Sequence, residues 1–373
     1  MALACFIVAA LGLILVLVSR HALFGGNVQS FPPKLGEIGI AVVIPARDEE
    51  ENLPKLLESL HAQTCAPELI LVVDDNSSDD TANIARASGV EVLSLNKLEP
   101  GWRGKPYALQ KGAEEIGRLS KGDPATHLLF VDSDVELHRD CLENLTSFTR
   151  DYQAISLCPH HVIKAPYEQL SAFFNLLMVG GVGALSSLSN QRERTLFGQF
   201  LLISREAFDE VGAYESVKDK VLENLFLSER LRTAGFRCLA LPGKRFARMR
   251  MFPEGYAQLL QSWTKGFSSG TQAVSPTLFA HSIILISGLF FVAIPTLIAL
   301  LISAELGQKL AVLNLYLITT FLLFTNLRQV GNFGYLTALL YPFYLIFHQW
   351  VFFNARKRKK SGMTTQWKGR DVS

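Results

Sequence analysis

The sequence predicts an α/β domain with a mostly parallel sheet, flanked by N-terminal and C-terminal transmembrane helices. Three observations predict this fold class. Apolar residues gather at residues 2–19 and again from about 278 to 353, with a more polar stretch between them. Within that stretch, strand-like runs alternate with helix-like runs. Several of these strands end in charged residues, as expected at the ligand-binding edge of a parallel sheet.

The composition limits the class of protein. The chain has 373 residues and a formal net charge of +2, enough length for one large domain or two smaller ones. It lacks the basic excess of a nucleic-acid-binding protein, so we expect no nucleic-acid partner. The cysteines form no CxxC pair, which argues against a disulfide framework or a zinc site and fits a reducing compartment.

The first apolar run, residues 2–19, contains no charge and approaches the length needed to cross a bilayer. A cleavable signal peptide would carry basic residues before its apolar run. Here Arg20 follows the run, so we expect residues 1–22 to be a retained anchor with its N-terminus outside. A buried helix of a soluble domain is the alternative, but such helices rarely lack a polar face.

Three further apolar segments, residues 278–303, 310–324 and 335–353, predict a C-terminal transmembrane region over residues 276–355. The chain then ends in a basic tail, residues 356–373. By the positive-inside rule this tail belongs in the cytoplasm.

The number of predicted spans conflicts with that location of the tail. One anchor and three later spans would place the tail on the side opposite a cytoplasmic middle domain. We give the charge more weight and expect one segment to be re-entrant or interfacial, with Pro295 marking the first of the three as the candidate. The expected location is a cell membrane, crossed several times, with the catalytic domain in the cytoplasm.

The middle domain, residues 36–275, begins with regularly alternating elements. Short β-branched runs predict buried strands, and leucines at helical spacing predict helices. Such alternation implies a largely parallel sheet. The expected strands cover residues 38–44, 69–73, 90–95 and 127–131, and the expected helices cover residues 53–60, 81–87 and 106–119.

Charged residues follow three of these strands. Arg47 and Glu49 follow the first strand, Asp75 follows the second, and Asp132 and Asp134 follow the fourth. Two carboxylates spaced Asp-x-Asp can bind a hard divalent cation that shares its oxygen ligands with a diphosphate. The pattern therefore predicts an Mg²⁺ or Mn²⁺ site at the end of the fourth strand. Exposed turns also contain such aspartates, and a calcium loop would need a central glycine and a terminal glutamate that are missing here.

Two further positions, Lys105 and Glu223, carry side chains suited to substrate binding or catalysis. Lys105 ends a glycine-containing loop, residues 101–105, at a predicted helix start, where phosphate oxygens bind well. The loop is not a P-loop, because its glycine spacing differs and Pro106 replaces the Ser or Thr. Glu223 lies on a predicted helix that Gly235 would end. Glu223 is either a general base or a solvated residue of that helix.

In their order along the chain, these motifs resemble the family 2 glycosyltransferases. The resemblance covers about residues 38–271. Within the family, the chain is most similar to the carotenoid- and hopanoid-associated branch. The resemblance implies the GT-A fold and the inverting transfer of a hexose, with glucose expected, from a UDP-sugar donor. The implied acceptor is a lipid in the membrane, such as a carotenoid acid or another isoprenoid lipid. The matching motifs are Val43-Ile44-Pro45-Ala46-Arg47-Asp48-Glu49, Val72-Val73-Asp74-Asp75-Asn76-Ser77-Ser78-Asp79 and Asp132-Ser133-Asp134, with Pro100-Gly101-Trp102-Arg103-Gly104-Lys105 and Phe197-Gly198-Gln199 typical of the branch.

The resemblance also implies roles for individual residues. Most of them would contact the donor, one would bind the metal ion, and Glu223 and Asp132 would act in catalysis. Pro45, Arg47 and Glu49 would line the nucleotide, Asp75 the uracil, Asp132 the ribose and diphosphate, Lys105 the donor, and Asp134 the metal ion.

Two departures from the family pattern affect the expected mechanism. The family usually has Glu-Asp or Asp-Asp where this chain has Glu223-Asn224, and the second acid is normally the base. The Gln-x-x-Arg-Trp motif of polysaccharide synthases is absent, which counts against a polymer product. We hypothesise that the acceptor is already ionised, such as a carboxylate or phosphate, so that a strong base is less needed. The alternatives are a catalytically weakened nucleotide-sugar-binding protein, a polyprenyl-phosphate glycosyltransferase and a membrane transporter.

Overall fold

The computed structural model describes residues 2–26, 38–120, 125–188, 195–220, 223–270, 275–302, 305–360, 365–367 and 370–372. The chain divides into two compact units. The sheet unit comprises Val28–His161 and Arg192–Met251. The helical unit comprises Met1–Asn27, Val162–Gln191 and Phe252–Ser373.

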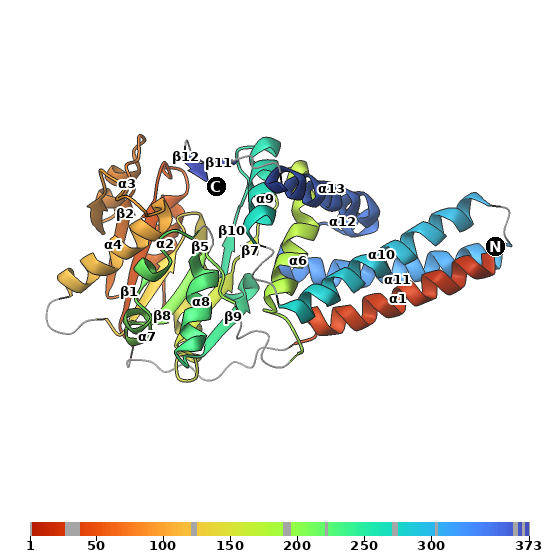
Figure 1. The fold of residues 1–373 in the computed structure, drawn as a ribbon, viewed down its shortest axis with the longest axis horizontal. Coiled ribbons are helices and arrows are strands. Elements are labelled where there is room, and N and C mark those ends of the chain that lie inside the picture. The colour runs from red at the N-terminus through yellow and green to blue at the C-terminus, as the bar shows by residue number, and fades with distance from the viewer. Residues whose placement is uncertain are drawn as a thin grey trace. The chain divides into compact units, whose positions relative to one another are not determined.

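The sheet unit contains a seven-stranded sheet in the order β3-β2-β1-β4-β8-β6-β9 (Figure 1). All neighbours pair in parallel except β8, which is antiparallel to both β4 and β6. The predicted mostly parallel α/β sheet is therefore confirmed. The strands are β1 (Ile40–Ala46), β2 (Leu69–Asp74), β3 (Glu91–Ser94), β4 (His127–Val131), β6 (Ala154–Cys158), β8 (Phe200–Ser204) and β9 (Cys238–Pro242).

Strand β1 is apolar on both sides, and helices cover both faces of the sheet. Val42 and Ile44 belong to one core cluster, which includes the buried leucines of α2 (Leu53–His61). Ala41 and Val43 belong to a second cluster with α4 (Gly104–Leu119). A strand buried on both faces needs such a continuous apolar sequence. The other helices are α3 (Thr81–Ala87), α5 (Cys141–Thr146), α7 (Arg205–Glu210) and α8 (Glu223–Thr233), with short 3₁₀ turns η2 (Tyr214–Val217) and η3 (Gly243–Arg245).

A second, three-stranded sheet orders the residues that follow β4. It has the order β5-β10-β7, where β5 is Val135–Leu137, β10 is Ala247–Met249 and β7 is His160–His161. An ion pair of 2.6 Å joins Arg248 Nη2 on β10 to Glu136 Oε2 on β5. Because β5 begins directly after Asp134, pairing with β10 fixes the backbone of the Asp-x-Asp turn.

The helical unit contains three helices that are long and apolar enough to cross a membrane, found among the described residues. They are Leu3–Phe24 within α1 (Ala2–Phe24), Pro276–Leu301 as α10, and Leu306–Val330 as α11. Shorter elements complete this unit: η1 (Pro166–Ser171), α6 (Ala172–Val182), α9 (Tyr256–Gly270), α12 (Tyr335–Leu339) and α13 (Tyr341–Lys360), with a terminal strand pair β11 (Thr365–Trp367) and β12 (Arg370–Val372).

The predicted span at residues 335–353 is wrong as a single helix. The chain breaks between α12 and α13 at Leu340, and neither piece is among the three membrane-crossing candidates of the described chain. Pro295 does not end its helix, since it lies within the 26-residue α10. Proline is tolerated in apolar helices where neighbouring groups compensate for the lost hydrogen bond.

Helices α1 and α10 approach at two glycines and lie side by side in Figure 1. A Cβ atom added to Gly12 would lie 2.8 Å from the Gly288 carbonyl oxygen, and one added to Gly288 would lie 2.8 Å from the Gly12 carbonyl oxygen. The two backbones are therefore in contact. Small residues allow this approach in helices that have no hydrophobic drive to associate within lipid.

Candidate functional site

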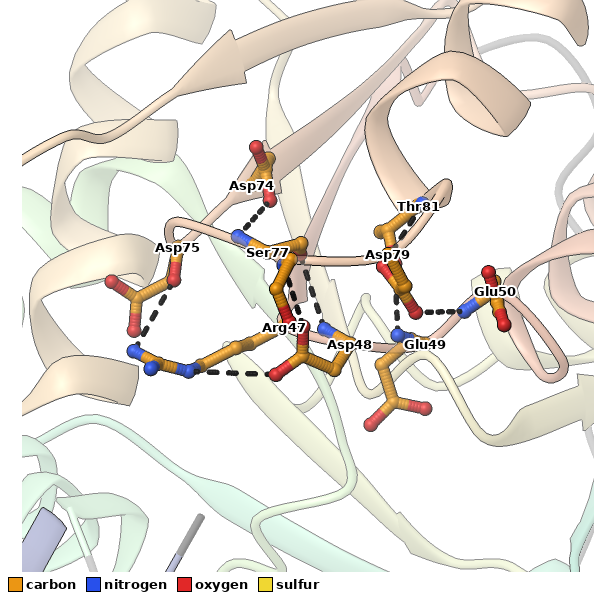
Figure 2. Close-up of polar contacts among 10 residues, drawn as sticks. Arg47, Asp48, Glu49, Glu50, Asp74, Asp75, Ser77, Asp79 and Thr81 are labelled. Atoms are coloured by element: carbon orange, nitrogen blue, oxygen red, sulfur yellow. Dashed lines mark hydrogen bonds and ion pairs between the residues drawn. The ribbon is translucent and has the colours of Figure 1, made fainter. Parts of the chain in front are cut away.

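The loops that follow β1 and β2 are joined by hydrogen bonds from one to the other (Figure 2). The Asp48 backbone N–H donates to Ser77 Oγ at 3.1 Å, and the Ser78 N–H donates to Asp48 Oδ1 at 2.7 Å. Asp48 and Asn76 both have positive φ, at 53° and 59°. Side chains of Asp and Asn tolerate this left-handed conformation better than most others. The paired loops thus form a preorganised edge at the carboxyl ends of these strands.

A second set of bonds ties the start of α3 to the loop after β1. The Glu49 N–H donates to Thr81 Oγ1 at 2.8 Å, and the Glu50 N–H donates to Asp79 Oδ2 at 3.1 Å. Partial burial raises the pKa of Asp79, but hydrogen bonds from Thr81 and from the Glu50 N–H bring it below its ordinary value. The Asp79 carboxylate therefore has a structural role, in keeping with its expected place in a turn.

The residues expected to contact the nucleotide lie on these two loops. Arg47 Nη1 donates to the Asp75 carbonyl oxygen at 3.5 Å, and Arg47 Nε lies 3.9 Å from Asp48 Oδ2. Pro45 is near the end of β1, paired with Val73. Figure 2 shows the Glu49 carboxylate pointing away from the bonded loops, while the Asp75 carboxylate lies beside the Arg47 guanidinium. The structure thus places Pro45, Arg47, Glu49 and Asp75 at one edge of the sheet.

Lys105 is the centre of a half-buried charge cluster, in which Lys105 and Asp132 are partly exposed and Glu223 is buried. Its Nζ atom lies 2.6 Å from Asp132 Oδ1, 3.0 Å from the Gly198 carbonyl oxygen and 3.7 Å from Glu223 Oε1. Burial lowers the pKa of Lys105, but the charges of Asp132 and Glu223 outweigh that effect and the pKa is raised. Lys105 is therefore an ammonium ion near neutral pH. Residues from α4, β4 and α8 meet at this point.

Glu223 is a buried member of this cluster, with 5% of its surface exposed. It lies in the first turn of α8. This position excludes the solvated alternative that the sequence left open. An ion pair with Lys105 keeps a carboxylate at this depth compatible with folding, because a buried charge without a partner is costly.

Asp134 lies in the turn between β4 and β5. Burial and the negative charges of Asp132 and Glu49 raise the pKa of Asp134 to about 7. The shift indicates that Asp134 lies within electrostatic range of Asp132 and Glu49. A divalent cation bound to Asp134 would offset this repulsion.

Among the described residues, no group of three or more His, Cys, Asp or Glu side chains is arranged to hold a metal ion by itself. This observation is compatible with Mg²⁺ or Mn²⁺, because such sites commonly use one or two carboxylates and complete the shell with water and substrate phosphates. The carboxylate oxygens of Asp132 and Asp134 suit a hard cation. Asp132 also forms an ion pair with Lys105.

Sequence reasoning missed the connections that hold this cluster together. Asn224 is buried, donates from Nδ2 to the Phe197 carbonyl oxygen at 2.9 Å, and accepts from the Tyr214 hydroxyl at 3.0 Å. Gly198 was noted only for its motif, yet its carbonyl oxygen binds Lys105. Tyr214 carries no local signal at all, since its partner is ten residues away on a helix whose position depends on the whole fold.

Comparisons with known proteins bear on this geometry. Residues 41–212 match the family described as "Glycosyl transferase family 2". The 4,4'-diaponeurosporenoate glycosyltransferase of Staphylococcus aureus strain USA300 is 28% identical over 347 residues, covering 90% of this chain and 88% of that protein. The protein of the same name from strain MRSA252 is 28% identical over 345 residues.

One solved structure resembles nearly the whole chain. It is the mannosyltransferase PcManGT from Pyrobaculum calidifontis, in complex with GDP-Man and Mn²⁺. The match covers 95% of this chain and 99% of that one, with 16% sequence identity and a TM-score of 0.51. At this identity the likeness concerns the fold.

Proposed function

Since the chain belongs to the family 2 glycosyltransferases and has their GT-A fold, we propose that it glycosylates an ionised lipid acceptor. The donor is a UDP-hexose, with glucose as the expected sugar, and the transfer inverts the anomeric carbon. The observation that carries the proposal is the cluster of Lys105, Asp132 and Glu223, which lies at the carboxyl end of the parallel strands, with Asp132 two residues before Asp134. The name of the S. aureus relatives supports a carotenoid acid as the acceptor.

The paired loops after β1 and β2 are suited to hold the nucleotide. Pro45 lies near the end of β1, Arg47 and Glu49 follow it in the first loop, and Asp75 lies beside Arg47 in the second. The Asp75 backbone N–H donates to the Ala46 carbonyl oxygen at 2.9 Å, which fixes the residue at the strand end. A carboxylate accepts hydrogen bonds only, so Asp75 is matched to the imide N–H of uracil. Asp132 would approach the ribose and the diphosphate.

Asp134, together with the donor's phosphate oxygens, would hold Mg²⁺ or Mn²⁺. The bound ion would supply charge stabilisation for the departing diphosphate. Lys105 adds a second positive charge, which is held in place by Asp132 and the Gly198 carbonyl oxygen. Charges that are preorganised in this way stabilise developing negative charge without reorganising during the reaction.

The acceptor needs little help from a base if it is a carboxylate. A carboxylic acid with a pKa of about 4 is almost fully ionised at neutral pH. Its oxygen attacks the anomeric carbon, the bond from that carbon to the diphosphate oxygen breaks, and UDP leaves with the electron pair. The product is a glycosyl ester, and no proton is transferred. Glu223 then orients the acceptor and Lys105, and is available as the base for a hydroxyl acceptor.

The three membrane-crossing candidates give a consistent topology. Helices α10 and α11 cross twice, so they return the chain to the side from which α10 starts. The sheet unit and the basic tail therefore share one side, and the positive-inside rule makes it the cytoplasm. Helix α13 then lies on the membrane surface, where Phe343, Ile346, Trp350 and Phe353 form an exposed apolar stripe. A lipid acceptor would reach the enzyme from this membrane.

The test is donor turnover by detergent-purified protein, measured as UDP release with a panel of UDP-sugars, Mg²⁺ or Mn²⁺, and total membrane lipid. We expect metal-dependent release with one preferred donor, and its loss in Asp134→Ala. Asp140→Ala, which removes an exposed aspartate in the turn after β5, is the matched control and should retain turnover.

The same assay separates the alternatives. Folded protein that releases no UDP with any donor would support the nucleotide-sugar-binding protein and contradict transfer. Product formed only on the phosphate-bearing lipids of the mixture would support a polyprenyl-phosphate acceptor in place of a carboxylate. GDP-mannose is added as a further donor, and GDP release from it without UDP release from any UDP-sugar would contradict the proposed nucleotide.

A further inference from the structure

We infer that Asn224 is a positioning residue, which fixes the segment that holds Lys105, and is not the remnant of a lost base. The inference deepens the proposed transfer reaction and rests on it. The family pattern has an acid at position 224, where it normally acts as the base. The observations that carry the inference are the two hydrogen bonds of the Asn224 amide and the contacts of the peptide that it holds.

The Asn224 amide has no free end to offer to a substrate. Only 3% of the residue is exposed. Nδ2 donates to the Phe197 carbonyl oxygen at 2.9 Å, and Oδ1 accepts from the Tyr214 hydroxyl at 3.0 Å. A base must reach the proton that it removes. The amide instead joins η2 to the segment before β8.

That segment, residues 197–199, is held at three points. The Phe197 N–H donates to Ser156 Oγ at 3.0 Å, and the Phe197 carbonyl oxygen accepts from Asn224. The Gln199 carbonyl oxygen accepts from the Asp132 N–H at 3.0 Å. With its neighbours fixed, the peptide between them presents the Gly198 carbonyl oxygen to Lys105 Nζ at 3.0 Å. Asn224 thus acts on Lys105 through this peptide.

Gly198 also determines the space beside the charge cluster. A Cβ atom at this position would lie 3.7 Å from Glu223 Oε1 and 3.9 Å from Lys105 Nζ. The glycine therefore borders the gap between the carboxylate and the ammonium ion. A movement of the segment would therefore alter the contacts of Gly198 with both side chains.

The chemistry of the two partners requires a side chain at position 224 that both donates and accepts a hydrogen bond. The Phe197 carbonyl oxygen can only accept, so the group that faces it must donate. An ionised aspartate would place two acceptors against each other at hydrogen-bond distance, while a protonated aspartic acid would satisfy both partners. The charged and titratable groups around this site are Glu223 on α8, Tyr214 on η2, Lys105 on α4 and Asp132 after β4.

The test measures kcat for Asn224→Asp and for the wild type from pH 5.5 to 9. The quantity compared is the ratio of kcat of the variant to kcat of the wild type at each pH. We expect a ratio near one at low pH, where the new acid is protonated and donates to Phe197. Above its pKa the ratio should fall about tenfold per pH unit, as for a single ionisation that inactivates. A ratio that rises with pH, or one that stays flat, would overturn the inference. A restored base would produce the rise.

Two further variants and the wild type itself complete the design. Asn224→Leu should be slow at every pH with no such fall, and UDP affinity in the same preparation reports whether it is folded. Tyr214→Phe, which removes one donor only, should reduce kcat by less than about tenfold and leave the shape of the pH profile unchanged. A wild type that releases no UDP refutes the proposed function, whereas an active wild type with a flat ratio refutes only the role of Asn224.

Discussion

The charge cluster of the sheet unit and the contact between α1 and α10 in the helical unit are held together in different ways. At the site of the sheet unit, Lys105 is bonded to Asp132 and Gly198, and Asn224 satisfies two partners. In the helical unit, Ser19 and Thr320 are fully buried, and their hydroxyl oxygens have no hydrogen-bond partner within the part of the chain that the structure describes. The candidate site of the first unit is ordered by charge and hydrogen bonding. The second depends on close packing at small residues such as Gly12 and Gly288.

This difference teaches which substitutions each unit should tolerate. Loss of one charge in the sheet unit leaves its partner buried and uncompensated, which is costly and is felt at the reaction centre. Added volume between α1 and α10 has no such electrostatic effect but prevents the backbones from meeting. Activity and stability should therefore separate between the two units.

The largest effect is expected from Lys105→Met. The change removes the cation that Asp132 and Glu223 share, so transition-state charge is less well stabilised. We expect kcat/KM to fall by about 100- to 1000-fold, the range for loss of one preorganised donor. Lys111→Met on the same helix is the control, since its partners Glu99 and Glu114 lie outside the cluster. A fall in kcat/KM of less than about threefold in Lys105→Met would contradict the role of the charge cluster in the sheet unit.

A smaller effect, on stability, is expected from Gly288→Leu. The new side chain meets the Gly12 carbonyl oxygen and Leu15, so α1 and α10 must separate. Overpacking of this kind costs about 1–3 kcal/mol, visible as a lower melting temperature in detergent. Gly307→Leu is matched to it, because a Cβ at Gly307 has nothing within 4 Å. Equal melting temperatures for the two variants would contradict tight packing of the helical unit.

Glu223→Gln sharpens the account of the acceptor. A carboxylate acceptor has no proton to lose, so we expect kcat to fall by no more than about tenfold. The change should be read from initial rates with a carotenoid acid at saturating donor. Donor binding, measured separately, reports whether the site is intact. Abolished turnover with donor binding preserved would refute the ionised-acceptor hypothesis.

The smallest effect concerns His161, which is buried in the sheet unit. Burial, with a contribution from His160, lowers the pKa of His161 to about 3. The unfolded chain binds a proton near pH 6.5 and the folded chain does not, so stability is complete above that pH and falls as the pH is lowered. Between pH 7.5 and 6 the loss is about 0.8 kcal/mol. His161→Leu should flatten this dependence of the melting temperature, and an unchanged dependence would contradict it.

The sheet was predictable because its signals are local and repeated. Alternating β-branched and leucine-rich runs located β1 to β4, and the rule for parallel sheets brought Asp75, Asp132 and Glu49 to one edge. The later strands β6, β8 and β9 were not located. Strand β8 is antiparallel and lies between β4 and β6, an order that no local pattern reveals.

The helical unit shows a different limit of sequence reasoning. Hydropathy located the apolar segments but did not show that residues 335–353 form two helices. Helix α13 carries its apolar residues on one exposed stripe and one buried face. The contact of Gly198 with Lys105 could not be read from spacing, since it joins positions 93 residues apart. Asn224 was noticed as a departure from a pattern, yet its partners depend on the tertiary fold.

The most direct test of the account is the structure of the product, determined by NMR after transfer from a UDP-hexose to a carotenoid acid. Inversion of the α-linked donor sugar by a carboxylate acceptor predicts a β-configured glycosyl ester, cleaved by mild alkali to the free acid. An α-configured sugar, or an alkali-stable glycoside on a hydroxyl group, would contradict it.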